Sequence, residues 1–164
     1  MGRVPAEHCG DCTPAREPHT VGQRWCADYG LSGVSTPVTS TASISGTQDD
    51  GLYLSARSGA DFGYSLALPD GTYDVVVHAA ELVYGSPLQR VFDVAMEGVT
   101  LLQGIDLVAL KGKEFAWQSP ASRVVVSGGS LEIDFVGTLG EALVAAVEVR
   151  SMALVDDDAD KLDF

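Results

Sequence analysis

Phe62-Gly-Tyr-Ser-Leu-Ala-Leu-Pro-Asp-Gly-Thr-Tyr73, continuing as Asp-Val-Val-Val-His-Ala-Ala-Glu81, is the most informative segment of the chain. Tyr64, Leu66 and Leu68 alternate with small or polar residues, which indicates a strand with one buried face. Pro69-Asp-Gly-Thr72 predicts a tight turn, because glycine readily adopts a positive φ. The Val-rich run from Tyr73 to Glu81 predicts a second strand, and we expect the two strands to pair as a hairpin.

The same alternation continues towards the C-terminus. Its clearest example is Leu131-Glu-Ile-Asp-Phe135, where apolar and acidic residues take turns. Ser127-Gly-Gly-Ser130, just before it, has the glycines that a hairpin turn prefers. Regularly spaced turns between short strands predict an all-β, two-sheet antiparallel β-sandwich of the Ig-like or jelly-roll type. The other expected strands cover Arg90–Met96, Val99–Leu102, Ile105, Phe115–Trp117, Arg123–Val126 and Leu143–Leu154.

Length and composition favour a single folded domain. The chain has 164 residues, of which 46% are apolar, enough for one hydrophobic core. We expect an N-terminal arm over residues 1–20, the sandwich over 21–153 and an acidic tail over 154–164. No apolar run is long enough for a transmembrane helix. The first 20 residues carry no apolar core of a signal peptide.

The formal net charge of −13 restricts the partners. An acidic surface repels phosphate groups, so we expect neither nucleic acid nor an anionic membrane as a partner. The arm and the acidic tail are candidate contacts for other protein subunits. The sequence indicates no cofactor.

All the cysteines lie near the N-terminus: Cys9, Cys12 and Cys26. Together with His8 they offer four potential zinc ligands. A second closely spaced pair, which zinc-binding motifs usually contain, is missing. A disulfide with one leftover thiol, or three thiols in a reducing compartment, fits the same residues, and the sequence leaves these alternatives open.

Several motifs taken together resemble the malectin family. The run Phe62–Tyr73 is similar to the hairpin of that family, Val77-His-Ala-Ala-Glu81 to its next strand, and Arg90-Val-Phe-Asp-Val94 to the strand that follows. The segments Leu131–Phe135 and Ala145–Val149 resemble its last two strands. The resemblance covers roughly residues 20 to 152. It implies a jelly-roll-like sandwich with a sugar site among the loops at one end.

The resemblance also implies which residues contact the sugar. Tyr29 and Tyr84 match ring positions of the family, and Glu141 approximately matches its acidic residue. Sugar C–H faces stack on aromatic rings and sugar hydroxyls donate to carboxylates. Ser58 and Val83 stand where the family has further rings, so half of the aromatic platform is missing.

Other polar residues have simpler interpretations. Glu81 either binds a ligand hydroxyl or holds the loop backbone, and the structural role is favoured. We expect Asp93 to bond a neighbouring loop, and His78 to lie in the core or on a sheet face. No catalytic motif is present.

The sequence therefore predicts a non-catalytic carbohydrate-binding module that takes an oligosaccharide. The alternative is a structural or interaction subunit that keeps the fold without binding sugar. The family resemblance favours a secreted, lumenal or cell-surface location.

Overall fold

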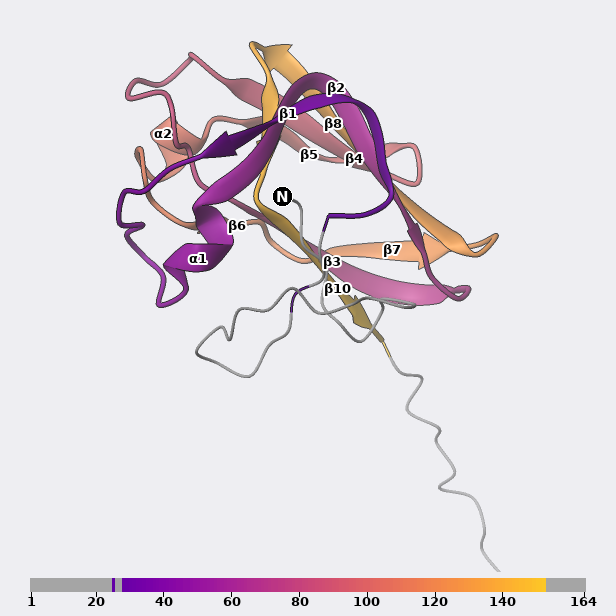
Figure 1. Ribbon diagram of the computed structural model, residues 1–164. Helices are drawn as coiled ribbons and strands as arrows, with labels where there is room; N and C mark the ends of the chain where they lie inside the picture. The colour runs from indigo at the N-terminus through magenta and orange to yellow at the C-terminus, as the bar shows by residue number, and fades with distance from the viewer. Residues whose placement is uncertain (1–24, 26–27, 153–164) are drawn as a thin grey trace, which may run out of the picture.

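A computed structural model describes Trp25 and residues 28–152 of the chain. In these residues, ten strands and two short helices form two facing antiparallel sheets (Figure 1). The two-sheet all-β sandwich predicted from the sequence is therefore confirmed. In chain order the elements are β1 (Leu31–Thr39), α1 (Asp50–Tyr53), β2 (Ser55–Ala67), β3 (Gly71–Ala79), β4 (Val91–Met96), β5 (Val99–Ile105), α2 (Leu107–Leu110), β6 (Trp117–Gln118), β7 (Ser122–Val126), β8 (Ser130–Leu139), β9 (Ala142–Val144) and β10 (Ala146–Ser151).

The larger sheet has the strand order β1-β2-β8-β4-β5, with β9 also paired to β2. One edge of β2 pairs with β1. Along its other edge, residues 57–59 pair with β9 and residues 61–67 pair with β8. Because the same edge of β2 pairs first with β9 and then with β8, the loop that joins β8 to β9 lies next to the N-terminal half of β2. This arrangement later positions Ser58 beside Glu141.

The smaller sheet has the order β10-β3-β6, with β7 also paired to β3. The core lies between the two sheets. From the larger sheet, Phe62 and Phe135 stack with their ring centroids 5.2 Å apart. From the smaller sheet, Val75 and Val77 are fully buried, because the alternation of β3 turns them inwards. Neither helix in the described part of the chain has the length and apolarity of a membrane span.

The expected hairpin at Pro69–Thr72 is wrong. Strand β2 belongs to the larger sheet and β3 to the smaller one, so this turn carries the chain across the sandwich. The turn after Val126 does the same between β7 and β8. Asp70 connects the two turns, because its Oδ1 accepts the backbone N–H groups of Gly128 at 2.8 Å and Gly129 at 2.9 Å.

The strand expected over Leu143–Leu154 is divided. Residues 142–144 form β9 in the larger sheet, and residues 146–151 form β10 in the smaller one. Ala145 is the crossing point, and its N–H donates to the carbonyl of His78. Asp93 bonds a neighbouring strand and not the expected loop, since its Oδ1 accepts the N–H of Gly104 in β5 at 2.7 Å.

Three carboxylates lie together on the outer face of the larger sheet: Asp61, Glu132 and Asp134. Partial burial, with additional repulsion from Asp61 and Glu132, raises the pKa of Asp134 above its usual 3.8. A raised folded-state pKa means that Asp134 contributes stability below the unfolded pKa, which is lost as the pH rises through the folded pKa.

We therefore expect Asp134→Asn to stabilise the domain slightly at pH 7, by up to about 0.5 kcal/mol because the side chain is exposed. The gain is expected to disappear at about pH 3, where the carboxyl is already protonated. Urea denaturation at both pH values measures this effect. An equal gain at both would mean that charge repulsion is not its cause.

Candidate functional site

A buried arginine connects four separate segments at one edge of the sandwich. Arg90 immediately precedes β4 and is 5% exposed. Its Nε donates to Glu81 Oε2 at 2.8 Å, and its Nη1 donates to Ser58 Oγ at 2.7 Å. Nη1 also lies 3.0 Å from the carbonyl oxygen of Glu141 and 3.2 Å from that of Ala142. We call Ser58, Glu81, Tyr84, Arg90 and Glu141 the Arg90 site.

Glu81 organises the loop that follows β3. It is 1% exposed, and its Oε1 accepts the backbone N–H groups of Val83 at 2.9 Å and Tyr84 at 3.1 Å. With Oε2 bound to Arg90, both oxygens are engaged. The geometry therefore places this carboxylate beneath the loop as its support, where a ligand hydroxyl has no access.

Tyr84 lies over the guanidinium group. The Cζ atom of Arg90 is 5.1 Å from the centre of the half-buried ring, a cation–π contact. Since Arg90 and Glu81 fix both the ring and the loop backbone, Tyr84 is pre-oriented. A ring held in this way presents its remaining surface without the entropy cost of ordering it.

Glu141 reaches the same place from the β8–β9 loop. Its Oε2 accepts the hydroxyl of Ser58 at 2.6 Å; Ser58 is 1% exposed, whereas Glu141 is exposed. Gly140 makes this position possible: its φ is +71°, and an added Cβ would lie 2.9 Å from the carbonyl oxygen of Gln89. The loop therefore packs closely against the segment that carries Arg90.

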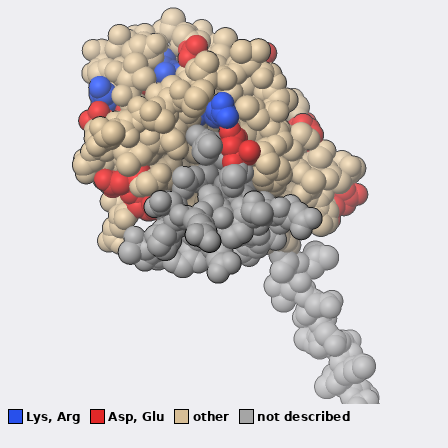
Figure 2. All heavy atoms as spheres, viewed as in Figure 1, with Lys and Arg blue, Asp and Glu red and all other residues tan. Residues whose placement is uncertain are grey.

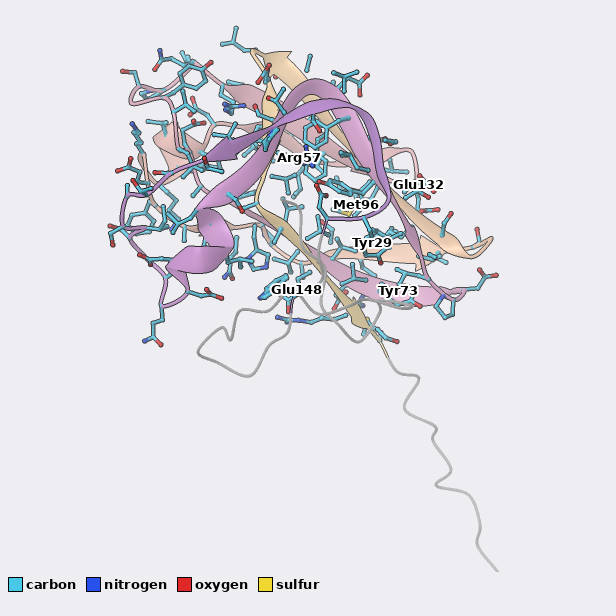
Figure 3. All side chains as sticks on the ribbon, in the orientation of Figure 1. Tyr29, Arg57, Tyr73, Met96, Glu132 and Glu148 are labelled. Atoms are coloured by element: carbon cyan, nitrogen blue, oxygen red, sulfur yellow. The ribbon has the colours of Figure 1, made fainter. Side chains whose placement is uncertain are left out.

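Tyr29 lies elsewhere in the fold. It is half-buried against the core, and in Figure 3 it is seen between the ribbons of the two sheets. The next residue, Gly30, accepts the N–H of Ser65 through its carbonyl. Of the four residues expected to contact sugar, the described contacts of the Arg90 site bring together Tyr84, Glu81 and Glu141 but not Tyr29.

A second buried carboxylate shapes the Arg90 side of the loop. Asp106 is 7% exposed and accepts the N–H of Leu88 at 2.6 Å and that of Ala109, in α2, at 3.0 Å. Leu88 adopts a φ of +61°, which is unfavourable for a residue with a Cβ. The side chains of Val83 and Leu88 are left 49% and 71% exposed. Hydrogen bonds to buried carboxylates thus fix the backbone of this loop while the side chains of Val83 and Leu88 face solvent.

A separate polar network lies on the outer face of the smaller sheet. The Nδ1 of His78 is 3.0 Å from the hydroxyl of Tyr53, and its Nε2 is 3.3 Å from Glu148 Oε2. Trp25 packs against the imidazole ring in a T-shaped arrangement with a centroid distance of 5.4 Å. His78 is therefore a sheet-face histidine, as expected. Burial, only partly opposed by the hydrogen bond to Glu148, lowers its pKa.

The predicted zinc or disulfide residues Cys9, Cys12, Cys26 and His8 lie outside the described residues. Among the residues that the structure describes, no group of three or more acidic, histidine or cysteine side chains is arranged to hold a metal ion. On the face shown in Figure 2, Lys and Arg form isolated blue patches and uncharged surface predominates.

Sequence reasoning missed Arg90 and Ser58 as members of the site. Arg90 was part of the motif Arg90–Val94, but its role was not inferred. Ser58 was noted only as the replacement of a ring. The sequence feature that could have indicated Arg90 is its position directly before a buried strand, because an arginine buried there needs an acidic or polar partner.

Comparison with known proteins agrees with the architecture. The family model of the malectin domain matches residues 12–155. Receptor-like protein 4 from Arabidopsis thaliana is 32% identical over an alignment of 108 residues, and the match covers 61% of this chain and 17% of that protein. The chain thus corresponds to a small part of this longer relative.

Solved structures share the fold. The structure of the plant peptide RALF23 in complex with FER and LLG2 matches with a TM-score of 0.68 and 18% identity, over 82% of this chain and 44% of that one. The ANXUR2 extracellular domain from Arabidopsis thaliana gives 0.62 and 16%, over 74% and 41%. A β-glucuronidase from Bacteroides uniformis gives 0.66 and 17%, over 83% and 15%. The matched family model spans most of this chain, and the protein therefore belongs to the malectin domain family.

Proposed function

We propose that this domain is a non-catalytic carbohydrate-binding module whose ligand contacts Tyr84 and Glu141 at the Arg90 site. The observation that carries the proposal is that the Arg90 site holds a pre-oriented ring over the guanidinium group and an exposed Glu141, whose carboxylate accepts the hydroxyl of Ser58. A sugar ring offers apolar C–H groups to an aromatic face and hydroxyl donors to a carboxylate. Membership of the malectin family supports the same assignment.

The carboxylates of the site favour binding over hydrolysis. Glycoside hydrolysis uses two carboxyl groups on opposite sides of the scissile bond. In the Arg90 site, Glu81 is buried, paired with Arg90 and bonded to two backbone N–H groups. Only Glu141 is exposed. A single accessible carboxylate orients hydroxyl groups but does not supply the second partner of the reaction.

Calorimetric and NMR titration with maltotriose, cellotriose and trigalacturonate tests the proposal. We expect at least one trisaccharide to bind, and Tyr84→Ala and Glu141→Gln each to weaken its affinity about tenfold, which corresponds to roughly 1.4 kcal/mol. Leu88→Ala removes another exposed side chain of the Tyr84 loop and is expected to bind normally. Glu132→Gln is the matched control for Glu141, because Glu132 also accepts a serine hydroxyl, that of Ser65.

Two results would contradict the proposal. One is the absence of binding to any of the trisaccharides at millimolar concentration. The other is equal weakening by the Glu132→Gln control, which would show that the loss comes from total charge and not from the site.

Restoring a ring at Val83 is expected to strengthen binding. Val83 is 49% exposed and adjoins Tyr84, and its backbone is already held by Glu81. A stacking ring contributes about 0.5–1.5 kcal/mol, so Val83→Tyr is expected to raise the affinity for the bound trisaccharide about two- to tenfold. Val83→Leu adds apolar bulk without a ring and is the control. An equal gain in both variants would argue against stacking.

A protein partner is the second candidate function. Val83 and Leu88 in the Tyr84 loop and Leu110 in α2 are 49%, 71% and 53% exposed. Removing such apolar surface from water favours association with a protein. One structure of similar fold contains a peptide and two proteins. Light scattering of the full chain tests this alternative. An assembly that Leu88→Asp dissociates, together with no trisaccharide binding, would favour it over the carbohydrate proposal.

A further inference from the structure

Arg90 has hydrogen-bonding capacity that the protein does not use. A guanidinium group has five N–H donors. Nε is bound to Glu81, and Nη1 faces Ser58 and the carbonyl oxygens of Glu141 and Ala142. No described residue accepts a hydrogen bond from Nη2, although the side chain is only 4% exposed. Arg90 is thus a nearly buried cation with an uncommitted amino group.

The surroundings limit how an acceptor reaches that group. The ring of Tyr84 covers the face of the guanidinium, and Glu81 and Ser58 hold its Nε and Nη1. Nη2 is not among the polar atoms that the described residues seal from solvent. An acceptor therefore approaches along the edge of the guanidinium plane, beside the ring.

We propose that Arg90 contacts the ligand directly, with Nη2 donating to an oxygen of a saccharide that lies against Tyr84. This inference rests on the carbohydrate-binding function proposed above. Glu141 Oε1 accepts a hydroxyl of the same saccharide, since Oε2 is bound by Ser58. The site then offers a fixed donor and a fixed acceptor next to one ring.

A fixed donor and acceptor make the site selective. A ligand that lacks the matching oxygen leaves a buried donor unpaired, and such losses are more costly than losing an apolar contact. Arg90 is suited to this role because its planar group is held at two nitrogens and retains one for recognition. We therefore expect Arg90 to determine specificity as well as to support the loop.

Arg90→Lys separates these roles. Lysine keeps a positive charge for Glu81 but lacks the planar group and its second amino nitrogen. We expect the variant to fold, and to bind the tightest of maltotriose, cellotriose and trigalacturonate at least tenfold more weakly than wild type. Arg57→Lys is the matched control: Arg57 is also a partly buried arginine, paired with Asp28 at 2.7 Å, but is not part of the Arg90 site. Its affinity is expected to stay unchanged.

NMR of the arginine side chains shows whether the contact is direct. The ¹⁵N–¹H signals of Arg90 are identified by their loss in Arg90→Lys, and we expect saturating trisaccharide to shift them in the wild type. If Arg90→Lys weakens binding but the signals do not move at saturation, Arg90 only supports the loop and the direct contact is wrong. If Arg90→Lys binds like wild type while Tyr84→Ala does not, the Arg90 proposal fails and the carbohydrate function stands. If no trisaccharide binds the wild type, both fail.

Discussion

Arg90→Met is expected to lower the free energy of unfolding by about 3–5 kcal/mol, because it leaves the buried Glu81 carboxylate without its cation. Glu81 and Arg90 are 1% and 5% exposed, and their side chains are 2.8 Å apart. The carboxylate cannot turn to solvent, since its other oxygen holds the N–H groups of Val83 and Tyr84. Urea denaturation followed by circular dichroism at pH 7 measures the change.

Two further variants test this explanation. Arg123→Met removes the cation of an exposed pair, in which the arginine side chain is 63% exposed and 3.1 Å from Asp74, and is expected to cost less than about 1 kcal/mol. The double variant Arg90→Met with Glu81→Gln removes the unpaired charge but keeps an acceptor for the loop. We expect it to regain more than half of the lost stability. A cost for Arg90→Met no greater than that for Arg123→Met would contradict the structural role of the pair.

The strands were predictable because their signal is local. Alternation such as that of Leu131–Phe135 follows from the two-residue period of a strand with one wet face. The pairing of strands was less predictable. Pro69–Thr72 specifies a tight turn whether the next strand pairs with the previous one or crosses to the other sheet. Here Asp70 ties this turn to Gly128 and Gly129, far along the chain, and such a contact has no local signature.

The site was only partly predictable for the same reason. Tyr84 and Glu141 were named from the family resemblance and their positions in loops. Ser58 and Glu141 are 83 residues apart in sequence, and only the successive pairing of β2 with β9 and β8 brings them together. Tyr29 also precedes a strand from a loop, but its ring packs against the core. Neighbouring residues alone did not distinguish its position from that of Tyr84.

A pH-dependent loss of stability is expected from the network around His78. Gln118 Nε2 donates to the hydroxyl of Tyr53 at 3.3 Å, and that hydroxyl lies 3.0 Å from Nδ1 of His78. The Nε2 of His78 lies 3.3 Å from Oε2 of Glu148. The other oxygen of that carboxylate, Oε1, is paired with Arg150 at 2.7 Å. Burial of the imidazole disfavours its charged form in the folded state. Burial lowers its pKa below the usual 6.5, whereas the hydrogen bond to Glu148 acts in the opposite direction.

The direction of the effect follows from proton linkage. With a lowered folded-state pKa, the unfolded chain binds more protons below pH 6.5, so stability is fully present above that value and falls as the pH drops through the folded pKa.

His78→Gln is expected to cost about 1–3 kcal/mol at pH 7.5 through imperfect replacement of two buried hydrogen bonds, and to flatten the decline between about pH 7 and 5 that His78 causes. Tyr53→Phe removes the hydroxyl beside Nδ1 but keeps the titrating ring, so its decline is expected to remain steeper than that of His78→Gln. Urea denaturation across this pH range compares the three proteins. An unchanged slope in His78→Gln would mean that other groups cause the decline and that the buried imidazole is not the titrating centre.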